Sequence, residues 1–165
     1  MTIPNPDHLL EQAARLAAGR PRQADLRRAI STAYYGLFHF CLAALADEFV
    51  GKTQRKTSRY ALVYRGISHR TLRDLCVEAR KQKPASRYTQ FIPDGGFSSG
   101  IHIFATGAME LRDNRHSADY DPQSQFDRRE ARAAIQTARA AIEHFRAAPE
   151  GDRTLFLTLL LSPPR

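Results

Sequence analysis

The chain has 165 residues, the length of one domain that can bury a hydrophobic core without disulfides. Its two cysteines exclude a disulfide framework, and the N-terminus lacks the continuous apolar segment of a secretory signal. No run approaches the roughly 20 apolar residues that span a bilayer, so we expect a cytoplasmic protein without a membrane partner. We interpret Cys41 and Cys76 as reduced core thiols, with a redox pair as the alternative.

The net charge of +8 comes almost wholly from arginine, because lysine occurs only at positions 52, 56, 81 and 83. Arginine forms bidentate hydrogen bonds with phosphate and stacks on bases, so this charge favours RNA or another polyanion as a partner. The alternative is a codon-usage bias that enriches arginine and alanine together and reflects no function.

The first two predicted elements are helices. A short helix fits residues 7–18, with Asp7 as its N-terminal cap and Gly19 at its end. A long helix follows from residue 23 to residue 50 and is closed by Gly51. Its apolar positions cover more than one face, so we expect it to be the central helix of a bundle.

Periodicity and turn residues predict the remaining elements up to residue 147. In chain order these are a loop over 52–58, a third helix over 59–81 with a weak point at Gly66, a surface connection over 83–96, a fourth helix over 98–120 and a fifth helix over 125–147. Small residues on one face of the fifth helix indicate close packing. No segment alternates with a period of two for long, so we expect an all-α, up-and-down bundle of four to five helices.

The chain ends in an apolar segment at 155–161 that does not fit a solvated tail. We therefore divide the chain into a helical bundle over 1–150 and a C-terminal segment over 151–165. The apolar run must be buried against its own bundle, against a second copy of the chain or against another partner.

A polar cluster closes the predicted fourth helix. On a helix of about 100° per residue, Arg112, Arg115, His116 and Asp119 lie within about 60° of the direction of Ile101, so the cluster continues the apolar face. In a structural interpretation, Asp119 pairs with Arg115 or with an arginine of the central helix and holds the end of the bundle together. In a functional one, the helix overhangs a cleft where the arginines bind phosphate and His116 transfers a proton.

A second polar strip lies on the predicted central helix, where Arg28, Thr32, Tyr35 and His39 fall within about 60° of arc. This strip is either an ordinary solvated face or one wall of a groove that faces the polar cluster of the fourth helix.

Both segments resemble motifs of one family. Residues 28–39, Arg-Ala-Ile-Ser-Thr-Ala-Tyr-Tyr-Gly-Leu-Phe-His, resemble the central-helix signature of bacterial HEPN-domain proteins. Residues 115–120 resemble the Arg-x-x-Ala-Asp-Tyr element that closes the fourth helix in a HEPN-related subfamily, and residues 65–70 resemble its short histidine-containing segment. The resemblance covers residues 23–146.

The resemblance implies a helical bundle that pairs as a homodimer. HEPN proteins include metal-independent ribonucleases, toxins that a partner nucleotidyltransferase modifies, and modules that only bind RNA or other proteins. The ribonucleases carry arginine and histidine separated by four to six residues. Here Arg112 and His116, like Arg65 and His69, have three residues between them, and the one formal match, Arg139 to His144, is expected by chance.

The leading prediction is an accessory or toxin-type HEPN protein that binds RNA or a nucleotide-handling partner, in a defence or toxin–antitoxin system. The alternatives are a metal-independent endoribonuclease and a purely structural protein-interaction subunit. The histidines are too scattered to suggest a metal site, and we predict no cofactor. The candidate catalytic residues are His116, Arg112 and Arg115, and the candidate nucleic-acid or nucleotide-binding residues are Arg28, Tyr35, His39, Arg65, His69, Asp119 and Tyr120.

Overall fold

The computed structural model describes residues 3–165, and within this range it contains helices and no strand, which confirms the all-α prediction. Eight α-helices and one 3-10 turn follow one another in the described chain. They are α1 (Pro6–Leu16), α2 (Gln23–Phe49), the 3-10 turn η1 (Lys52–Gln54), α3 (Ser58–Tyr64), α4 (His69–Ala79), α5 (Ser86–Thr89), α6 (Ser99–Tyr120), α7 (Arg128–Ala147) and α8 (Glu150–Leu161).

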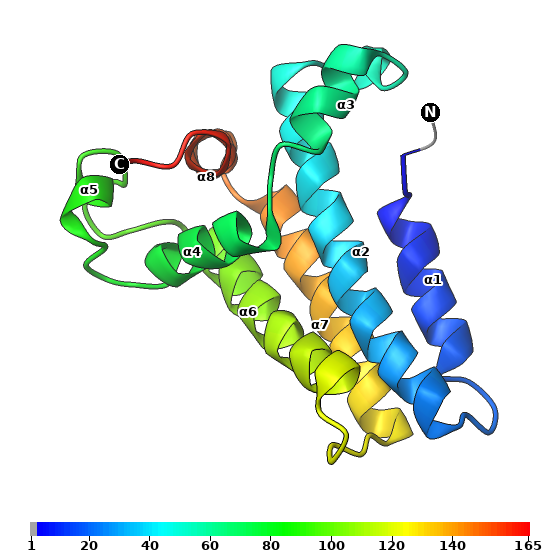
Figure 1. Ribbon diagram of the computed structural model, residues 1–165. Helices are drawn as coiled ribbons and strands as arrows, with labels where there is room; N and C mark the ends of the chain where they lie inside the picture. The colour runs from blue at the N-terminus through cyan, green and yellow to red at the C-terminus, as the bar shows by residue number, and fades with distance from the viewer. Residues whose placement is uncertain (1–2) are drawn as a thin grey trace.

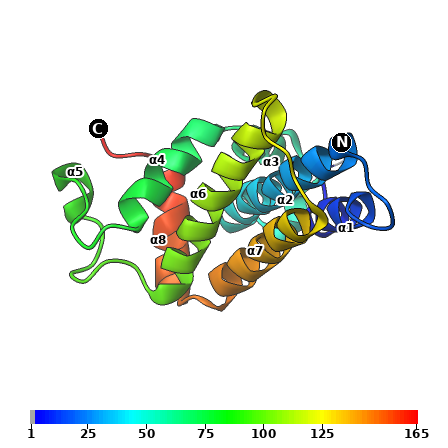
Figure 2. The ribbon, with the colours of Figure 1, turned by 90° about the horizontal axis from the view of Figure 1, so that it is seen from below.

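Four helices form the body of the molecule, and successive members of this set run in opposite directions (Figure 1). They are α1, α2, α6 and α7, and α2 packs against each of the other three. The segment from α3 to α5 is inserted between α2 and α6. Figures 1 and 2 both show α4, α5 and α8 gathered at one side of the bundle, away from α1.

The central position predicted for α2 is confirmed by its burial on several sides, since residues from Leu26 to Ala46 are buried around most of its circumference. Contrary to the expectation from the sequence, α2 is long and apolar enough by length and composition to cross a membrane. In this fold, however, 78% of its most apolar window is buried inside the protein. Its apolar surface is therefore covered by other helices of the same chain.

Four phenylalanine rings from four helices meet in the core. Phe104 of α6 lies with its ring centroid 4.8 Å from that of Phe145 of α7 and 5.6 Å from that of Phe156 of α8. Phe40 of α2 packs edge-on against Phe145 at 5.6 Å. The apolar run near the C-terminus thus forms α8 and lies against its own bundle, where Phe156 is completely buried.

Small residues let α6 and α7 approach closely, as the composition of the predicted fifth helix indicated. A Cβ atom on Gly100 would lie 2.7 Å from the backbone oxygen of His144, and one on Gly107 would lie 3.0 Å from the Cβ of Ala141. Larger side chains at these two positions would therefore force the helices apart.

The start of α1 and the predicted third helix differ from expectation. Asn5, not Asp7, caps α1, because its side chain accepts a hydrogen bond of 2.9 Å from the backbone N–H of Asp7. The helix predicted over 59–81, with its weak point at Gly66, is divided there into α3 and α4. Ser68 begins the second of these as its N-cap, accepting a hydrogen bond of 3.1 Å from the N–H of Thr71.

The predicted surface connection over 83–96 contains the short helix α5 and is anchored to the bundle. Tyr88 and Ile92 of this segment are buried. Glu78 of α4, itself 8% exposed, accepts hydrogen bonds of 2.7 Å from the Lys81 ammonium group and from the backbone N–H of Ala85. The connection is therefore held by a satisfied buried carboxylate.

The two cysteines are buried and free, which agrees with their interpretation as core thiols. Burial raises the pKa of Cys41 to about 12 and also raises the pKa of Cys76, so both remain protonated at neutral pH.

Replacing Phe156 with alanine should lower the free energy of unfolding by about 3–5 kcal/mol, because it leaves a cavity beside the rings of Phe97, Phe104 and Phe145. Urea denaturation followed by circular dichroism measures this loss. Leu161→Ala is the matched control on α8; its side chain is 40% exposed, and the expected change is within about 0.5 kcal/mol. Equal losses for the two variants would contradict the docking of α8.

Candidate functional site

Arg115 lies at the centre of a cluster formed by α2 and the end of α6. Its Nε donates a hydrogen bond of 3.0 Å to Oδ2 of Asp119, one helical turn away. The other carboxylate oxygen of Asp119 accepts a hydrogen bond from the hydroxyl of Ser31 on α2. We call the following residues the arginine–tyrosine cluster: Ser31, Tyr34, Tyr35, Arg115, Asp119 and Tyr120.

Three tyrosine rings surround the Arg115 guanidinium. Its central carbon lies 5.1 Å from the ring centroid of Tyr35, 5.5 Å from that of Tyr34 and 6.0 Å from that of Tyr120. These distances fall within the range of cation–π attraction. Since only 18% of the Arg115 side chain is exposed, its charge is stabilised mainly from inside the protein. The pairing with Asp119 matches the structural interpretation of this cluster.

Two tyrosine–histidine hydrogen bonds continue the site from α2 towards α3 and α4. The hydroxyl of Tyr34 is 2.8 Å from Nδ1 of His69, the first residue of α4, and Nδ1 of His39 is 2.7 Å from the hydroxyl of Tyr64 at the end of α3. Phe38 packs against the His69 ring at 3.9 Å between centroids. These contacts fix the two inserted helices against the middle of α2.

Burial lowers the pKa of both histidines, and the positive charge of Arg115 lowers that of His69 further. Burial also raises the pKa of Tyr34, and it raises that of Tyr64 to about 12. Each pair therefore consists of a neutral imidazole and a neutral phenol at physiological pH.

The outer edge of the cluster is exposed. The ring of Tyr120 is 64% exposed and lies 5.3 Å from the ring of His116 between centroids. Arg112, one turn earlier on α6, donates a hydrogen bond of 2.9 Å to the neighbouring carboxylate of Asp113. We call these three residues, Arg112, His116 and Tyr120, the exposed edge.

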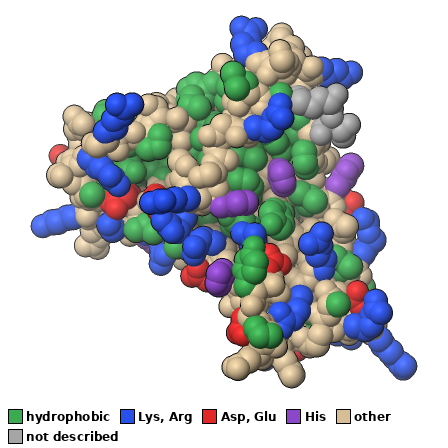
Figure 3. Space-filling model, viewed as in Figure 1, with side chains coloured by type: hydrophobic (Ala, Val, Ile, Leu, Met, Phe, Trp, Pro, Cys, Tyr) green, Lys and Arg blue, Asp and Glu red, His purple; other side chains and the backbone are tan. Residues whose placement is uncertain are grey.

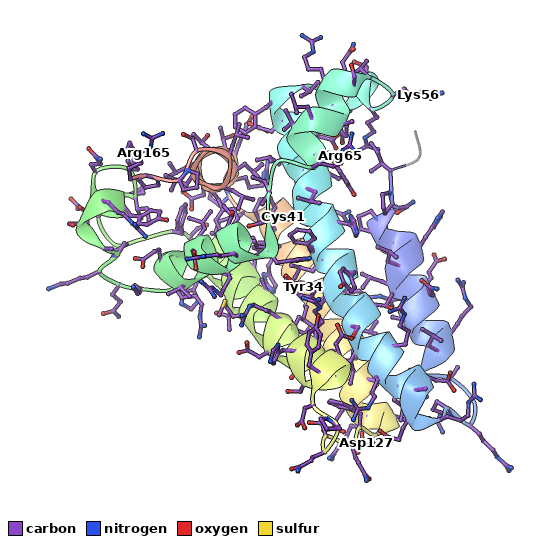
Figure 4. The ribbon with its side chains drawn as sticks, in the orientation of Figure 1. Tyr34, Cys41, Lys56, Arg65, Asp127 and Arg165 are labelled. Atoms are coloured by element: carbon purple, nitrogen blue, oxygen red, sulfur yellow. The ribbon has the colours of Figure 1, made fainter. Side chains whose placement is uncertain are left out.

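The structure brings most of the predicted site residues together but not all of them. Tyr35 lies between His69 and Arg115, and His39 lies one turn further along α2. Arg28 is exposed near the start of α2, and Arg65 is exposed at the end of α3, where its Nε donates back to the carbonyl of Ala61. Figure 4 shows Arg65 well separated from Tyr34 along α2. Within residues 3–165, no hydrogen bond or ion pair joins the side chain of either arginine to the arginine–tyrosine cluster.

Sequence reasoning missed Arg27, which joins the start of α2 to the end of α6. Its guanidinium donates hydrogen bonds of 2.9 Å to the carbonyls of Ala118 and Asp121, and a further one to the carbonyl of Ser124. These acceptors include carbonyls that the end of α6 leaves free. The sequence shows Arg27 next to the apolar positions of α2. It does not show the partners of Arg27, because these are backbone carbonyls, which side-chain patterns do not reveal.

Together α2, α4 and α6 form one face of the molecule. Figure 3 views this face and shows histidine side chains among hydrophobic ones, with a group of lysine and arginine side chains beside them over α4 and α6. Arg70 and Arg73 of α4 contribute to this charge and share the single carboxylate of Asp74. The face therefore combines part-exposed rings with positive charge.

Across residues 3–165, no three histidine, cysteine, aspartate or glutamate side chains come together in a group that could hold a metal ion. No family model, curated protein or solved structure matches the chain.

Arg115→Ala should lower the free energy of unfolding by about 2 kcal/mol, because it removes the ion-pair partner of Asp119, which keeps only its bond to Ser31, and the charge that three tyrosines surround. Thermal and urea denaturation measure the effect. Arg112→Ala, which removes a pair with an exposed carboxylate, is the control and should cost less than about 1 kcal/mol. The same small loss in both variants would rule out a structural role for Arg115.

The stability of the protein should fall as the pH decreases below neutrality. The folded-state pKa values of His39 and His69 lie below the ordinary value of 6.5, so the unfolded chain binds more protons as the pH falls through that value. The free energy of unfolding is then highest above pH 6.5, and this contribution is lost between 6.5 and the lowered pKa values.

Melting temperatures measured from about pH 7.5 to about pH 5.5 test this dependence. A His39→Gln, His69→Gln double variant should show a much flatter profile, because glutamine keeps hydrogen-bonding groups but does not titrate in this range. His102→Gln, at an exposed position on α6, should retain the dependence of the native protein. If the double variant and the native protein show the same dependence of melting temperature on pH, groups other than His39 and His69 cause it.

Proposed function

We propose that this protein is a HEPN-type RNA-binding module that holds single-stranded RNA on the face formed by α2, α4 and α6. The observation that carries the proposal is the arrangement of part-exposed rings around positive charge, in which Tyr35 and Tyr120 lie next to the Arg115 guanidinium and His116 lies beside Tyr120. Single-stranded nucleic acids are bound by stacking of bases on such rings and by cations along the backbone.

Exposure of Tyr120 supports the proposal directly. A large ring that is 64% exposed at the end of a helix contributes little to the fold, but it offers a stacking surface next to an imidazole. The net charge of +8 adds a general attraction for phosphates. The exposed edge thus supplies the stacking surface, and the net positive charge of the protein supplies the attraction for phosphate.

The contacts of Arg115 favour binding over cleavage. A ribonuclease that used Arg112, Arg115 and His116 would need arginine groups free to bind the phosphate that is cleaved. Here Nε of Arg115 donates to Asp119 and its guanidinium is packed among tyrosines, while Arg112 is bonded to Asp113. We therefore assign Arg115 a positioning role, which holds Tyr35 and Tyr120 in place.

The resemblance to HEPN proteins also suggests where the protein acts and with which partners. We propose that the chain acts in the cytoplasm as a homodimer, in a defence or toxin–antitoxin system, with a nucleotidyltransferase or another protein of that system as its partner. These points rest on the motifs at 28–39 and 115–120 and on the helical bundle that carries them.

Tyr120→Ala should weaken RNA binding about ten-fold, because one base–ring stack contributes about 1–3 kcal/mol. Fluorescence anisotropy with a labelled single-stranded RNA of about 16 nucleotides measures the dissociation constant at roughly 0.1 M salt. Phe91→Ala is the matched control, since it removes an exposed aromatic ring in the segment after α5. Equal affinities for the two variants would contradict the assignment of the site.

The same RNA, incubated with the native protein in EDTA and run on a denaturing gel, distinguishes binding from cleavage. We expect intact RNA with the native protein and with His116→Ala. Cleavage by the native protein that His116→Ala abolishes would instead establish the ribonuclease alternative.

A further inference from the structure

A large concave pocket lies apart from the α2–α4–α6 face. It has a volume of about 850 Å³, within the range of small-molecule sites. Its walls come from the segment before α1, the second half of α2, η1 and the adjoining parts of α7 and α8. Figure 4 shows Lys56, one of its lining residues, at the end of the molecule where the N-terminal segment lies. None of the residues of the exposed edge lines this pocket.

The inner wall of the pocket is apolar. It includes Phe40 and Ala44 of α2, Phe145 of α7 and Leu157 of α8. The two phenylalanines pack edge-on against each other and belong to the core, so this wall is rigid. A rigid apolar wall suits a ligand with an apolar body, which would displace water from it.

Two of the acidic side chains at the pocket already have partners. Asp47 accepts hydrogen bonds of 3.0 Å from Nε of Arg55 and 2.9 Å from the hydroxyl of Tyr60. Glu48 accepts one of 2.7 Å from the hydroxyl of Thr154 on α8. Their contacts join α2 to η1, α3 and α8, so these carboxylates hold the pocket walls together.

Four cationic side chains at the same pocket have no acidic partner. Lys52 and Lys56 are exposed at and just after η1, and Arg146 extends from α7 so that its guanidinium lies 5.2 Å from the centroid of the Phe40 ring. The fourth, Arg153 of α8, donates hydrogen bonds to the backbone carbonyls of Arg146 and Ala148. None of the four forms an ion pair within residues 3–165. The carboxylates of Asp7 and Glu48 offset two of these charges, and the remainder leaves the rim positive.

We infer that this pocket binds a small amphipathic organic anion, with an apolar body against the Phe40–Phe145 wall and a carboxylate or phosphate at the rim. The planar guanidinium of Arg146 can donate two parallel hydrogen bonds to a carboxylate or phosphate. The ammonium groups of Lys52 and Lys56, at and just after η1, add positive charge from a different part of the chain. Cations without acidic partners, from η1 and from α7, lie beside the same apolar wall. This arrangement distinguishes the pocket from an ordinary charged surface. The inference does not depend on RNA binding.

Titration with anilinonaphthalene sulfonate, a fluorescent amphipathic anion, tests the site in the full-length protein. We expect saturable binding of one molecule per chain. Dodecanoate, an acyl carboxylate, and adenosine monophosphate, an aromatic phosphate, are then tested as competitors of the probe. The compound that displaces the probe at the lower concentration shows whether the pocket binds an acyl chain or an aromatic ring more tightly. Inorganic phosphate alone should not displace the probe, because it lacks an apolar body.

The Lys52→Glu, Lys56→Glu double variant should weaken probe binding at least about ten-fold, because both rim cations are reversed. The matched control is Arg129→Glu, Arg132→Glu, which makes the same change in net charge on exposed residues of α7 outside the pocket. Ala44→Phe, which fills the apolar wall, should also weaken binding, and a melting curve checks that it folds. No saturable binding, or equal binding by the lysine variant and its control, would overturn the inference.

RNA affinity provides an independent readout. Loss of probe binding in the lysine variant, with an affinity for RNA equal to that of its Arg129→Glu, Arg132→Glu control, supports two separate sites. Because Tyr120→Ala leaves the pocket intact, it should retain probe binding even if it loses RNA binding.

Discussion

A helix of 27 residues that is apolar around most of its circumference can be stable in water only if other helices cover its apolar sides. In this protein α1, α6 and α7 cover α2 along its length, and α8 completes the core at Phe156. Every polar group on the buried parts of α2 must then find a partner on a neighbouring element, because an unpaired buried polar group is costly.

The polar contacts of α2 show how this requirement arranges the rest of the fold. Ser31 donates to Asp119 of α6, Tyr34 is bonded to His69 of α4, and His39 is bonded to Tyr64 of α3. Each contact is directional, whereas apolar packing alone would tolerate small shifts of one helix along another. The hydrogen bonds thus orient α3, α4 and the end of α6 relative to α2, and they hold the rings of the α2–α4–α6 face in place.

Local patterns predicted the long helices closely, because α2, α6 and α7 have sustained apolar periodicity and clear stops such as Gly51. The sequence predicts a single third helix with a weak point at Gly66, whereas the structure has two helices that meet there. The apolar positions of the predicted helix continue through Gly66, but the capping hydrogen bond of Ser68 begins a new helix there. The connection over 83–96 was read as exposed, and Tyr88 is nevertheless buried because Glu78 holds the segment against the bundle.

For the candidate site, the sequence alone determined that Arg112, Arg115, His116 and Asp119 share one side of their helix, since 100° per residue is a local property of the backbone. It also determined that α2 would be central. Only the tertiary structure decided what those side chains meet. Arg115 lies among tyrosines of α2, Arg28 and Arg65 are exposed, and Arg27 binds backbone carbonyls at the end of α6. Such contacts join residues about 90 positions apart, and their geometry depends on how the helices pack.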